Sequence, residues 1–155
     1  MRTLDLYVRS LVGPGNHDEQ DDLLAAAARL ERAGVVDETR FTVLGEKLCR
    51  CGRCATTRPT RERLREIDRW RSWAEMAGAT LLLDEHPVRS SITGQEYRYV
   101  VPPTVTLVCR VDGEIEAVYP SRQDGSVTTP ADYLEAAAVD AEEPASRRDI
   151  GTVPE

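Results

Sequence analysis

Hydrophobic and polar residues alternate with different periods along the first half of the chain, and each period predicts an element. Leu4 to Val8 and Arg40 to Leu44 alternate with the period of strands. Between them, the capping-box-like start at Asn16 and the glycine at Gly34 delimit a helix. The stripe that this helix buries is expected to consist of Leu23, Ala27 and Leu30.

A second helix is predicted from about Thr60 to Ala77, with Gly78 as its stop and a short apolar strand, Thr80 to Leu83, after it. Trp70 and Trp73 fall at helical spacing, which favours core or rim packing over a base-stacking platform. The buried face of this second helix is expected to consist of Leu64, Ile67, Trp70, Ala74 and Ala77.

Two β-rich runs, Val105 to Val111 and Glu114 to Tyr119, flank the pair Asp112-Gly113. Asp-Gly suits a two-residue hairpin turn, because both central residues need a positive φ. A closing helix is predicted to start at Thr129 and to run through Ala138. Simple alternation places Val105, Leu107 and Cys109 on one face with Val118, and Val108 on the other face with Ala117. Both faces are then apolar, which indicates a sheet covered on both sides by helices.

The remaining segments complete the predicted organisation. Residues 79–101 read as an inserted segment, in which Thr93-Gly94 is expected to turn between two further strands, Val88 to Ile92 and Tyr97 to Val101. A single domain is predicted over residues 1–138, since 155 residues leave little length for a second core. Residues 139–155 are acidic and without periodicity and are predicted to form a mobile tail.

The composition predicts a soluble, acidic protein. The chain has 20 basic and 27 acidic residues, a net charge of −7, and all its basic residues but Lys47 are arginine. This profile resembles proteins of salt-accumulating haloarchaea. No apolar run reaches the roughly 20 residues that a membrane span needs, so a cytoplasmic protein is expected. In ordinary salt the net charge disfavours DNA binding, whereas molar salt shortens the Debye length to about 3 Å and weakens that argument.

The order β, α, β, α, insert, β-hairpin, α resembles the thioredoxin-like fold. The local match is strongest where Pro103-Thr104 leads into the Asp112-Gly113 hairpin and the closing helix. The resemblance implies a mixed central sheet and a cis peptide bond before Pro103, with an ordinary rigid turn as the alternative. The family's Cys-x-x-Cys is absent from the first helix, where Asn16, His17 and Asp18 stand, so its dithiol activity does not carry over.

Three cysteines lie within six residues, in Cys49-Arg50-Cys51-Gly52-Arg53-Cys54. Thiolates at this spacing suit one Zn²⁺ ion with a fourth ligand from elsewhere. Cys51 and Cys54 are alternatively a redox dithiol, or the three are free thiols without a function. In a thioredoxin-like sheet His17 lies at the edge that holds these cysteines and Pro103, which makes it the preferred fourth ligand, although a solvent-facing histidine stays an alternative. Cys109 is expected to be a buried core thiol, because it lies six residues along the strand from Pro103.

Eight arginines against three carboxylates between Arg50 and Arg71 give a local excess of five positive charges. This surface could contact nucleic acid or an acidic protein partner. The alternative is a solvated helix face with internal pairs such as Glu62 with Arg65 and Glu66 with Arg69. The arginines proposed to contact a partner are Arg50, Arg53, Arg58, Arg61 and Arg65.

A second resemblance is local. Leu23 to Leu48, with Leu30 to Val36 followed by Phe41 to Lys47, is similar to the recognition helix and wing of winged helix-turn-helix transcription factors. Residues 1–16 are too few for the two helices that precede this unit in such domains.

The sequence therefore predicts one α/β domain of thioredoxin-like type, acting as a small cytoplasmic binding or regulatory module rather than an enzyme. A zinc or thiol site at the proline edge is expected from Cys49, Cys51, Cys54 and His17. A winged helix-turn-helix DNA-binding regulator is the first alternative. A thiol-disulfide oxidoreductase that uses Cys51, Cys54 and Pro103 is the second.

Overall fold

The computed structural model describes residues 1–9, 17–45, 48–50, 58–89, 91–92, 94 and 96–140, except for the side chains of His17, Arg58 and Val88. Three helices lie in this part of the chain: α1 (His17–Arg32), α2 (Arg58–Ala77) and a C-terminal helix over residues 130–140. The strands are β1 (Arg2–Val8), β2 (Glu38–Val43), β3 (Leu48–Cys49), β4 (Thr80–Leu81), β5 (Asp84–Arg89), β6 (Glu96–Val101), β7 (Val105–Val111), β8 (Glu114–Tyr119), β9 (Ser121–Gln123) and β10 (Ser126–Thr128).

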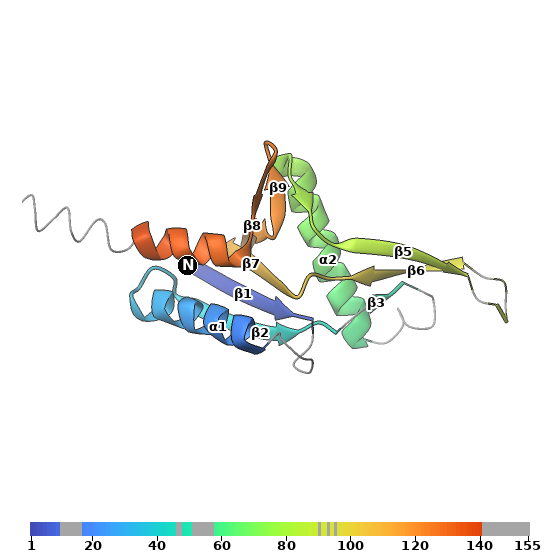
Figure 1. Cartoon of the computed structure of the whole chain (residues 1–155), viewed down its shortest axis with the longest axis horizontal. Helices are drawn as coiled ribbons and strands as arrows, with labels where there is room; N and C mark the ends of the chain where they lie inside the picture. The colour runs from blue at the N-terminus through green and yellow to red at the C-terminus, as the bar shows by residue number, and fades with distance from the viewer. Residues whose placement is uncertain are drawn as a thin grey trace, which may run out of the picture.

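A mixed sheet of four strands in the order β2-β1-β7-β8 forms the centre of the fold (Figure 1). β1 is parallel to β2 and antiparallel to β7, and β7 is antiparallel to β8. The mixed α/β class and the order βαβα, insert, ββα agree with the prediction.

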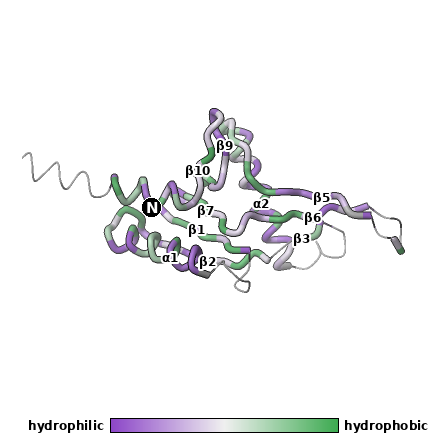
Figure 2. Tube along the Cα trace, in the orientation of Figure 1, coloured by the Kyte–Doolittle hydropathy of each residue, from purple (hydrophilic) through white to green (hydrophobic). Residues whose placement is uncertain are grey.

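Helices cover both faces of this sheet. On one face, Leu4, Leu6 and Leu107 pack with the buried side chains of α1 and with Leu134 of the C-terminal helix. On the other face, Val108 and Val118 pack against Ile67 and Trp70 of α2. Figure 2 shows that hydrophobic and hydrophilic residues alternate along α1, as expected for a helix with one buried stripe. The sheet is thus buried on both faces, as the apolar hairpin predicted.

The helix boundaries follow their sequence signals. Gly34 and Gly78 adopt φ of 78° and 69° after α1 and α2, a left-handed conformation that favours glycine. At the C-terminal helix, Thr129 Oγ1 accepts a hydrogen bond from the amide of Asp132 at 3.1 Å, and the Asp132 carboxylate accepts one from the amide of Thr129 at 3.1 Å. This reciprocal cap confirms the predicted start. The helix extends two residues past the predicted end, to residue 140, and the rest of the predicted tail lies outside the described residues.

The predicted faces of β8 were wrong, although the hairpin turn was right. Asp112 and Gly113 have φ of 53° and 85°, as a two-residue turn of this kind requires. A bulge then separates the pair Arg110–Ile115 from the pair Cys109–Ala117, which leaves Glu116 as the extra residue. One extra residue reverses the faces of all residues that follow. Val118 therefore packs toward α2 and Ala117 toward α1.

Two small sheets extend from the body. β3, β6 and β5 form one, whose β5–β6 hairpin points away from the central sheet (Figure 1). This confirms a hairpin in the insert, with its first strand at residues 84–89 instead of 88–92. The other sheet joins β4 to a short hairpin of β9 and β10 that turns at Asp124-Gly125. β4 is shorter than predicted and ends at Leu81, and Ala77 is exposed instead of buried.

Candidate nucleic-acid interface

Helix α2 buries one face and leaves the opposite one open. Leu64, Ile67, Trp70 and Ala74 are at most 6% exposed and recur at helical spacing. Pro59 stands in the first turn, where a proline costs no intrahelical hydrogen bond. The buried stripe fixes the rotation of the helix on the sheet and directs the remaining side chains to solvent.

An arginine row runs along the open face of α2. We call Arg61, Arg65 and Arg69 the arginine row, because a spacing of four residues places them on one side with a rise of about 6 Å between neighbours. Arg61 and Arg65 are exposed, and the Arg69 side chain is 63% exposed. Within the described part of the chain, neither Arg61 nor Arg65 forms an ion pair. Two of the three charges are therefore available to a partner.

Grooves flank the helix on both sides of this row. One groove, of about 590 Å³, lies between α2 and the β1–β2 side of the sheet and includes Tyr7, Thr42 and Arg63. The other, of about 810 Å³, lies toward the β7–β8 turn and includes Met76 and Glu114. Arg65 and Arg69 line both grooves, so these two members of the row stand on a ridge between them.

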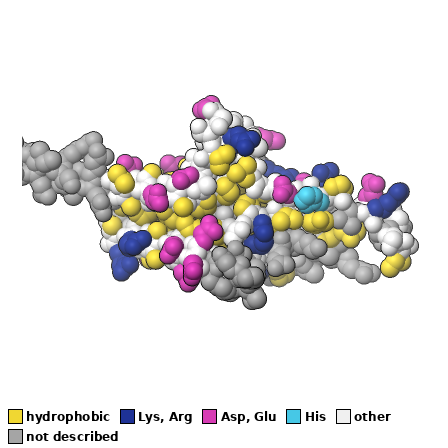
Figure 3. All heavy atoms as spheres, viewed as in Figure 1, with side chains coloured by type: hydrophobic (Ala, Val, Ile, Leu, Met, Phe, Trp, Pro, Cys, Tyr) yellow, Lys and Arg dark blue, Asp and Glu magenta, His cyan; other side chains and the backbone are white. Residues whose placement is uncertain are grey.

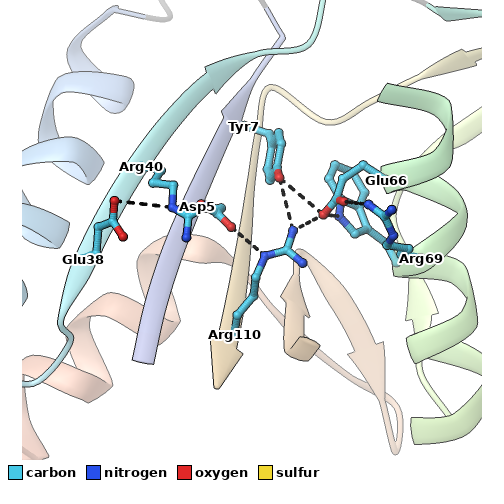
Figure 4. A network of polar contacts seen from close by, with 8 residues as sticks. Asp5, Tyr7, Glu38, Arg40, Glu66, Arg69 and Arg110 are labelled. Carbon is cyan, nitrogen blue, oxygen red and sulfur yellow. Dashed lines mark hydrogen bonds and ion pairs between the residues drawn. The ribbon is translucent and has the colours of Figure 1, made fainter. Parts of the chain in front are cut away.

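A buried polar network lies beneath the ridge and joins α2 to the central sheet (Figure 4). Arg110 of β7 donates from Nε to Asp5 at 2.6 Å, and from its terminal nitrogen to Tyr7 at 3.2 Å and to Glu66 of α2. The side chains of Asp5, Glu66 and Arg110 are only 6%, 11% and 13% exposed. Charge-assisted bonds of this kind hold the helix at one position on the sheet.

Glu66 gathers the other members of the network. Its carboxylate accepts hydrogen bonds from Trp70 Nε1 at 3.1 Å, from the Tyr7 hydroxyl at 3.3 Å and from Arg69 at 2.7 Å. Burial opposes ionisation of Glu66, but the hydrogen bonds from Arg110 and Arg69 outweigh it and lower the pKa of Glu66. Burial, with the nearby charges of Glu66 and Asp5, raises the pKa of Tyr7 to about 12. The Glu66 carboxylate is thus ionised beside the buried guanidinium of Arg110, and Tyr7 is neutral.

A second cluster neutralises part of the predicted arginine surface. Glu85 of β5 accepts hydrogen bonds from Arg50 at 2.7 Å and from Arg71 at 3.0 Å, and Arg98 lies 3.9 Å away. Arg50 also donates to Asp68 of α2 at 2.9 Å. These pairs attach the base of the β5–β6 hairpin to α2. The Arg50 guanidinium is already paired with two carboxylates, and its contact with a partner stays a prediction.

The other predicted contact residues separate into two groups. Arg61 and Arg65 lie together in the arginine row, and Arg69 extends it. Arg53 and the Arg58 side chain lie outside the described residues. Of the internal pairs that the sequence suggested, the one between Glu66 and Arg69 is present at 2.7 Å.

The thiol residues are only partly described. Cys49 lies in β3, pairs with Tyr99 of β6 and is half-buried. Cys51, Cys54 and the His17 side chain lie outside the described residues. Among the residues that the structure describes, no cluster of three potential metal ligands occurs. The zinc site and the redox pair stay predictions. Cys109 is 1% exposed, which confirms a core thiol, and burial raises its pKa to about 12.

Pro103 lies at the predicted edge but without the predicted geometry. The amide of Arg9, just after β1, donates to the Thr104 carbonyl at 2.9 Å, which places Pro103 beside the end of β1. Arg9 also donates twice to the Pro102 carbonyl, at 2.9 and 2.6 Å. Within the described residues the cis bond is Tyr119–Pro120, so the expected cis bond before Pro103 is wrong.

Sequence reasoning missed Asp5, Tyr7 and Arg110. The pattern of each strand gives no sign of their contacts, since the partners of Arg110 are 44 to 105 residues away. Arg110 alone carries a sequence signal, because it interrupts a strand that is apolar on both faces, where an unpaired charge would be costly.

The sequence was compared with models of known protein families. A model described as a helix-turn-helix domain matches residues 1–142. The chain belongs to this helix-turn-helix family. No curated protein and no solved structure matches it. The thioredoxin-like resemblance consequently rests on the order of elements alone, whereas the helix-turn-helix resemblance is supported at the level of the family.

Within this helix-turn-helix family member, the described residues contain no two helices joined directly by a turn. α1 ends at Arg32, and β2 and β3 precede α2 at Arg58. The proposed wing from Phe41 onward is wrong, because residues 41–43 belong to β2, which pairs in parallel with β1. None of the described helices is apolar enough over a sufficient length to cross a bilayer.

Proposed function

We propose that this protein binds duplex DNA through the arginine row of α2 and acts as a regulator of transcription. Membership of a helix-turn-helix family supports a nucleic-acid partner. The observation that carries the proposal is the row itself: Arg61 and Arg65 are exposed and form no ion pair with the described residues, and Arg65 stands between two grooves. The major groove of B-DNA, about 12 Å wide, admits an α-helix.

Charge distribution favours α2 over the other exposed elements. The projecting hairpin of β5 and β6 carries three carboxylates against two arginines, so it is weakly acidic. The first turn of α1 is acidic as well. The net charge of −7 would then repel DNA from most of the surface and leave α2 as the face that a duplex can approach.

The buried network fixes the position of α2 and therefore the direction in which the arginine row points. Glu66 lies one residue from Arg65 and bonds to Arg69, while its other contacts go to Arg110 and Tyr7 of the sheet. A helix whose rotation is set by the sheet presents its arginines in one register. Preorganisation of this kind lowers the entropy cost of binding.

Fluorescence anisotropy with a labelled 25-base-pair duplex tests the proposal over a series of salt concentrations. Each phosphate contact adds about −0.9 to the slope of log K against log salt. The double variant R61Q/R65Q is expected to make the slope less steep by about 2 and to weaken binding to all sequences similarly. The matched control R89Q/R122Q removes two exposed arginines from other elements and is expected to leave the slope unchanged.

Two results would overturn the proposal. The wild-type protein would bind neither a mixed-sequence duplex nor a pool of duplexes at any salt concentration tested. Alternatively, R61Q/R65Q would bind like the control while its circular dichroism and thermal melt match those of the wild type.

A further inference from the structure

An apolar groove lies on the face of the molecule opposite α2. It runs between α1 and the C-terminal helix, has a volume of about 840 Å³ and is lined largely by alanine and leucine, including Ala26, Leu30, Ala131 and Leu134. Figure 3 shows hydrophobic side chains gathered between these two helices with charged side chains at the margins. Such a groove is a potential docking surface.

The charges on the open side of α1 have an ordered arrangement. Asp18 and Asp22 lie in its first two turns and Arg29 and Arg32 in its last turn, with four alanines between the two groups. Asp22 and Arg29 are seven residues apart, which places them on one side of the helix but separates them by about 10 Å along its axis. They are too far apart to pair within one chain.

These charges are free in the described part of the chain. Asp18, Asp22 and Arg29 are exposed, line the groove and form no ion pair there. By contrast, most arginines near the central sheet are paired, as the clusters around Glu66 and Glu85 show. Within the described residues these α1 charges are thus unsatisfied, and they are ordered along the helix, beside the further carboxylates of Glu19 and Glu135.

The pattern is self-complementary for two antiparallel helices. If a second α1 crosses the first in the opposite direction at Ala25 and Ala26, Asp22 of one copy faces Arg29 of the other, and the reverse pair forms by symmetry. In the same arrangement Asp18 lies opposite the residue next to Arg32 of the second copy. Alanine at the crossing point permits close approach of the two backbones. An interface in which one patch meets itself is the usual geometry of a twofold dimer.

We infer that the groove between α1 and the C-terminal helix is the interface of a twofold homodimer, with α1 antiparallel to its copy and Asp22 paired with Arg29 across the axis. The dimer covers the apolar groove of each chain. It leaves α2 uncovered, since α2 lies on the other face of the sheet. The inference stands on the groove and on the α1 charges and does not depend on DNA binding.

A charge exchange tests the pairing. D22R and R29E each place like charges across the axis and are expected to weaken the dimer at least roughly tenfold in sedimentation velocity at 0.15 M salt. The double variant D22R/R29E restores opposite charges and is expected to return to the wild-type dimer. An equimolar mixture of the two single variants is expected to form a heterodimer, because D22R supplies only arginines and R29E only carboxylates at these positions.

The matched control is R122Q, an exposed arginine of β9, which should leave the dimer intact. A25R brings two added arginines together at the axis without altering Asp22 or Arg29, and is expected to give monomers. All variants change exposed residues, and their thermal melts report retention of the fold.

Three results would overturn the inference. A monomeric wild type at 100 µM would mean that another partner, such as a basic helix, covers the groove. Dimers that persist in D22R, R29E and A25R would place the interface elsewhere. A double variant that stays monomeric while folded would refute the pairing of Asp22 with Arg29.

Discussion

Replacing Arg110 by methionine isolates the energetic role of the buried network. Methionine keeps an unbranched chain of similar length but removes the guanidinium that contacts Asp5, Tyr7 and Glu66. The substitution leaves two carboxylates without their shared cation, with side chains only 6% and 11% exposed. We expect the free energy of unfolding at pH 7 to fall by about 3 to 5 kcal/mol, the range for a buried pair that loses one partner.

Urea denaturation followed by tryptophan fluorescence measures this loss. Trp70 is fully buried and donates a hydrogen bond to Glu66, so its emission reports the environment of the network. The control is R69M, which removes another cation from the same carboxylate. Because the Arg69 side chain is 63% exposed, its loss is expected to cost less than about 1 kcal/mol.

The stability loss of R110M is expected to depend on pH in a defined direction. In the wild type, the depressed pKa of Glu66 contributes stability that is present above its ordinary value and lost as the pH falls through the folded value. In R110M Glu66 keeps only the exposed Arg69 as a cationic partner while its burial is unchanged, so the pKa of Glu66 should rise above the ordinary range. The deficit of R110M relative to the wild type should therefore shrink between pH 7 and pH 5. Equal losses in R110M and R69M, or a deficit that does not change with pH, would refute this account of the network.

Three further outcomes are expected. Because burial raises the pKa of Cys109 to about 12, C109S should leave the number of thiols that react rapidly with Ellman's reagent at pH 8 unchanged in the folded protein; a decrease by one would contradict a core thiol. T129A should lower stability by about 1 kcal/mol and T129N should restore most of it, since the cap hydrogen bond to Asp132 needs a side-chain oxygen; equal melts of all three proteins would argue against the cap. Elemental analysis after chelator-free purification should find about one zinc per chain if Cys49, Cys51, Cys54 and His17 form the predicted site, and a value below ~0.2 would exclude it.

The sequence predicted the elements whose signals are local. The two-residue turn at Asp112-Gly113, the left-handed glycine at Gly78 and the cap at Thr129 each depend on residues within a few positions of one another. The buried stripes of α1 and α2 follow from the helical period alone. These features need no knowledge of the distant chain, so they could be read correctly.

The faces of β8 were predicted wrongly because its bulge has no signal in the sequence. Nothing in the run Glu114 to Tyr119 marks Glu116 as the extra residue of a bulge. The hairpin at Asp124-Gly125 is the opposite case, because the same Asp-Gly signal was present and was missed between strands of only three residues. Short strands lack the alternation that draws attention to a turn.

The arginine surface shows how pairing limits prediction from composition. Eight arginines in one stretch of sequence indicate a basic patch, but Arg50 and Arg71 turn to Glu85, which follows them by 35 and 14 residues. Arg61 and Arg65 stay open because no carboxylate of the described residues reaches them. Which charges are free is therefore set by the tertiary fold.

The pairing of β1 with β7 has a consequence for synthesis of the chain. Val8 pairs with Val105, so the centre of the sheet joins segments about 100 residues apart. At translation rates of about 5 to 20 residues per second, β1 waits roughly 5 to 20 s for its antiparallel partner. During that interval one edge of β1 and the apolar side chains of Leu4, Leu6 and Val8 have only α1 and β2 to cover them. An unpaired strand edge favours aggregation, so β1 is expected to be a site of aggregation in the nascent chain until β7 emerges.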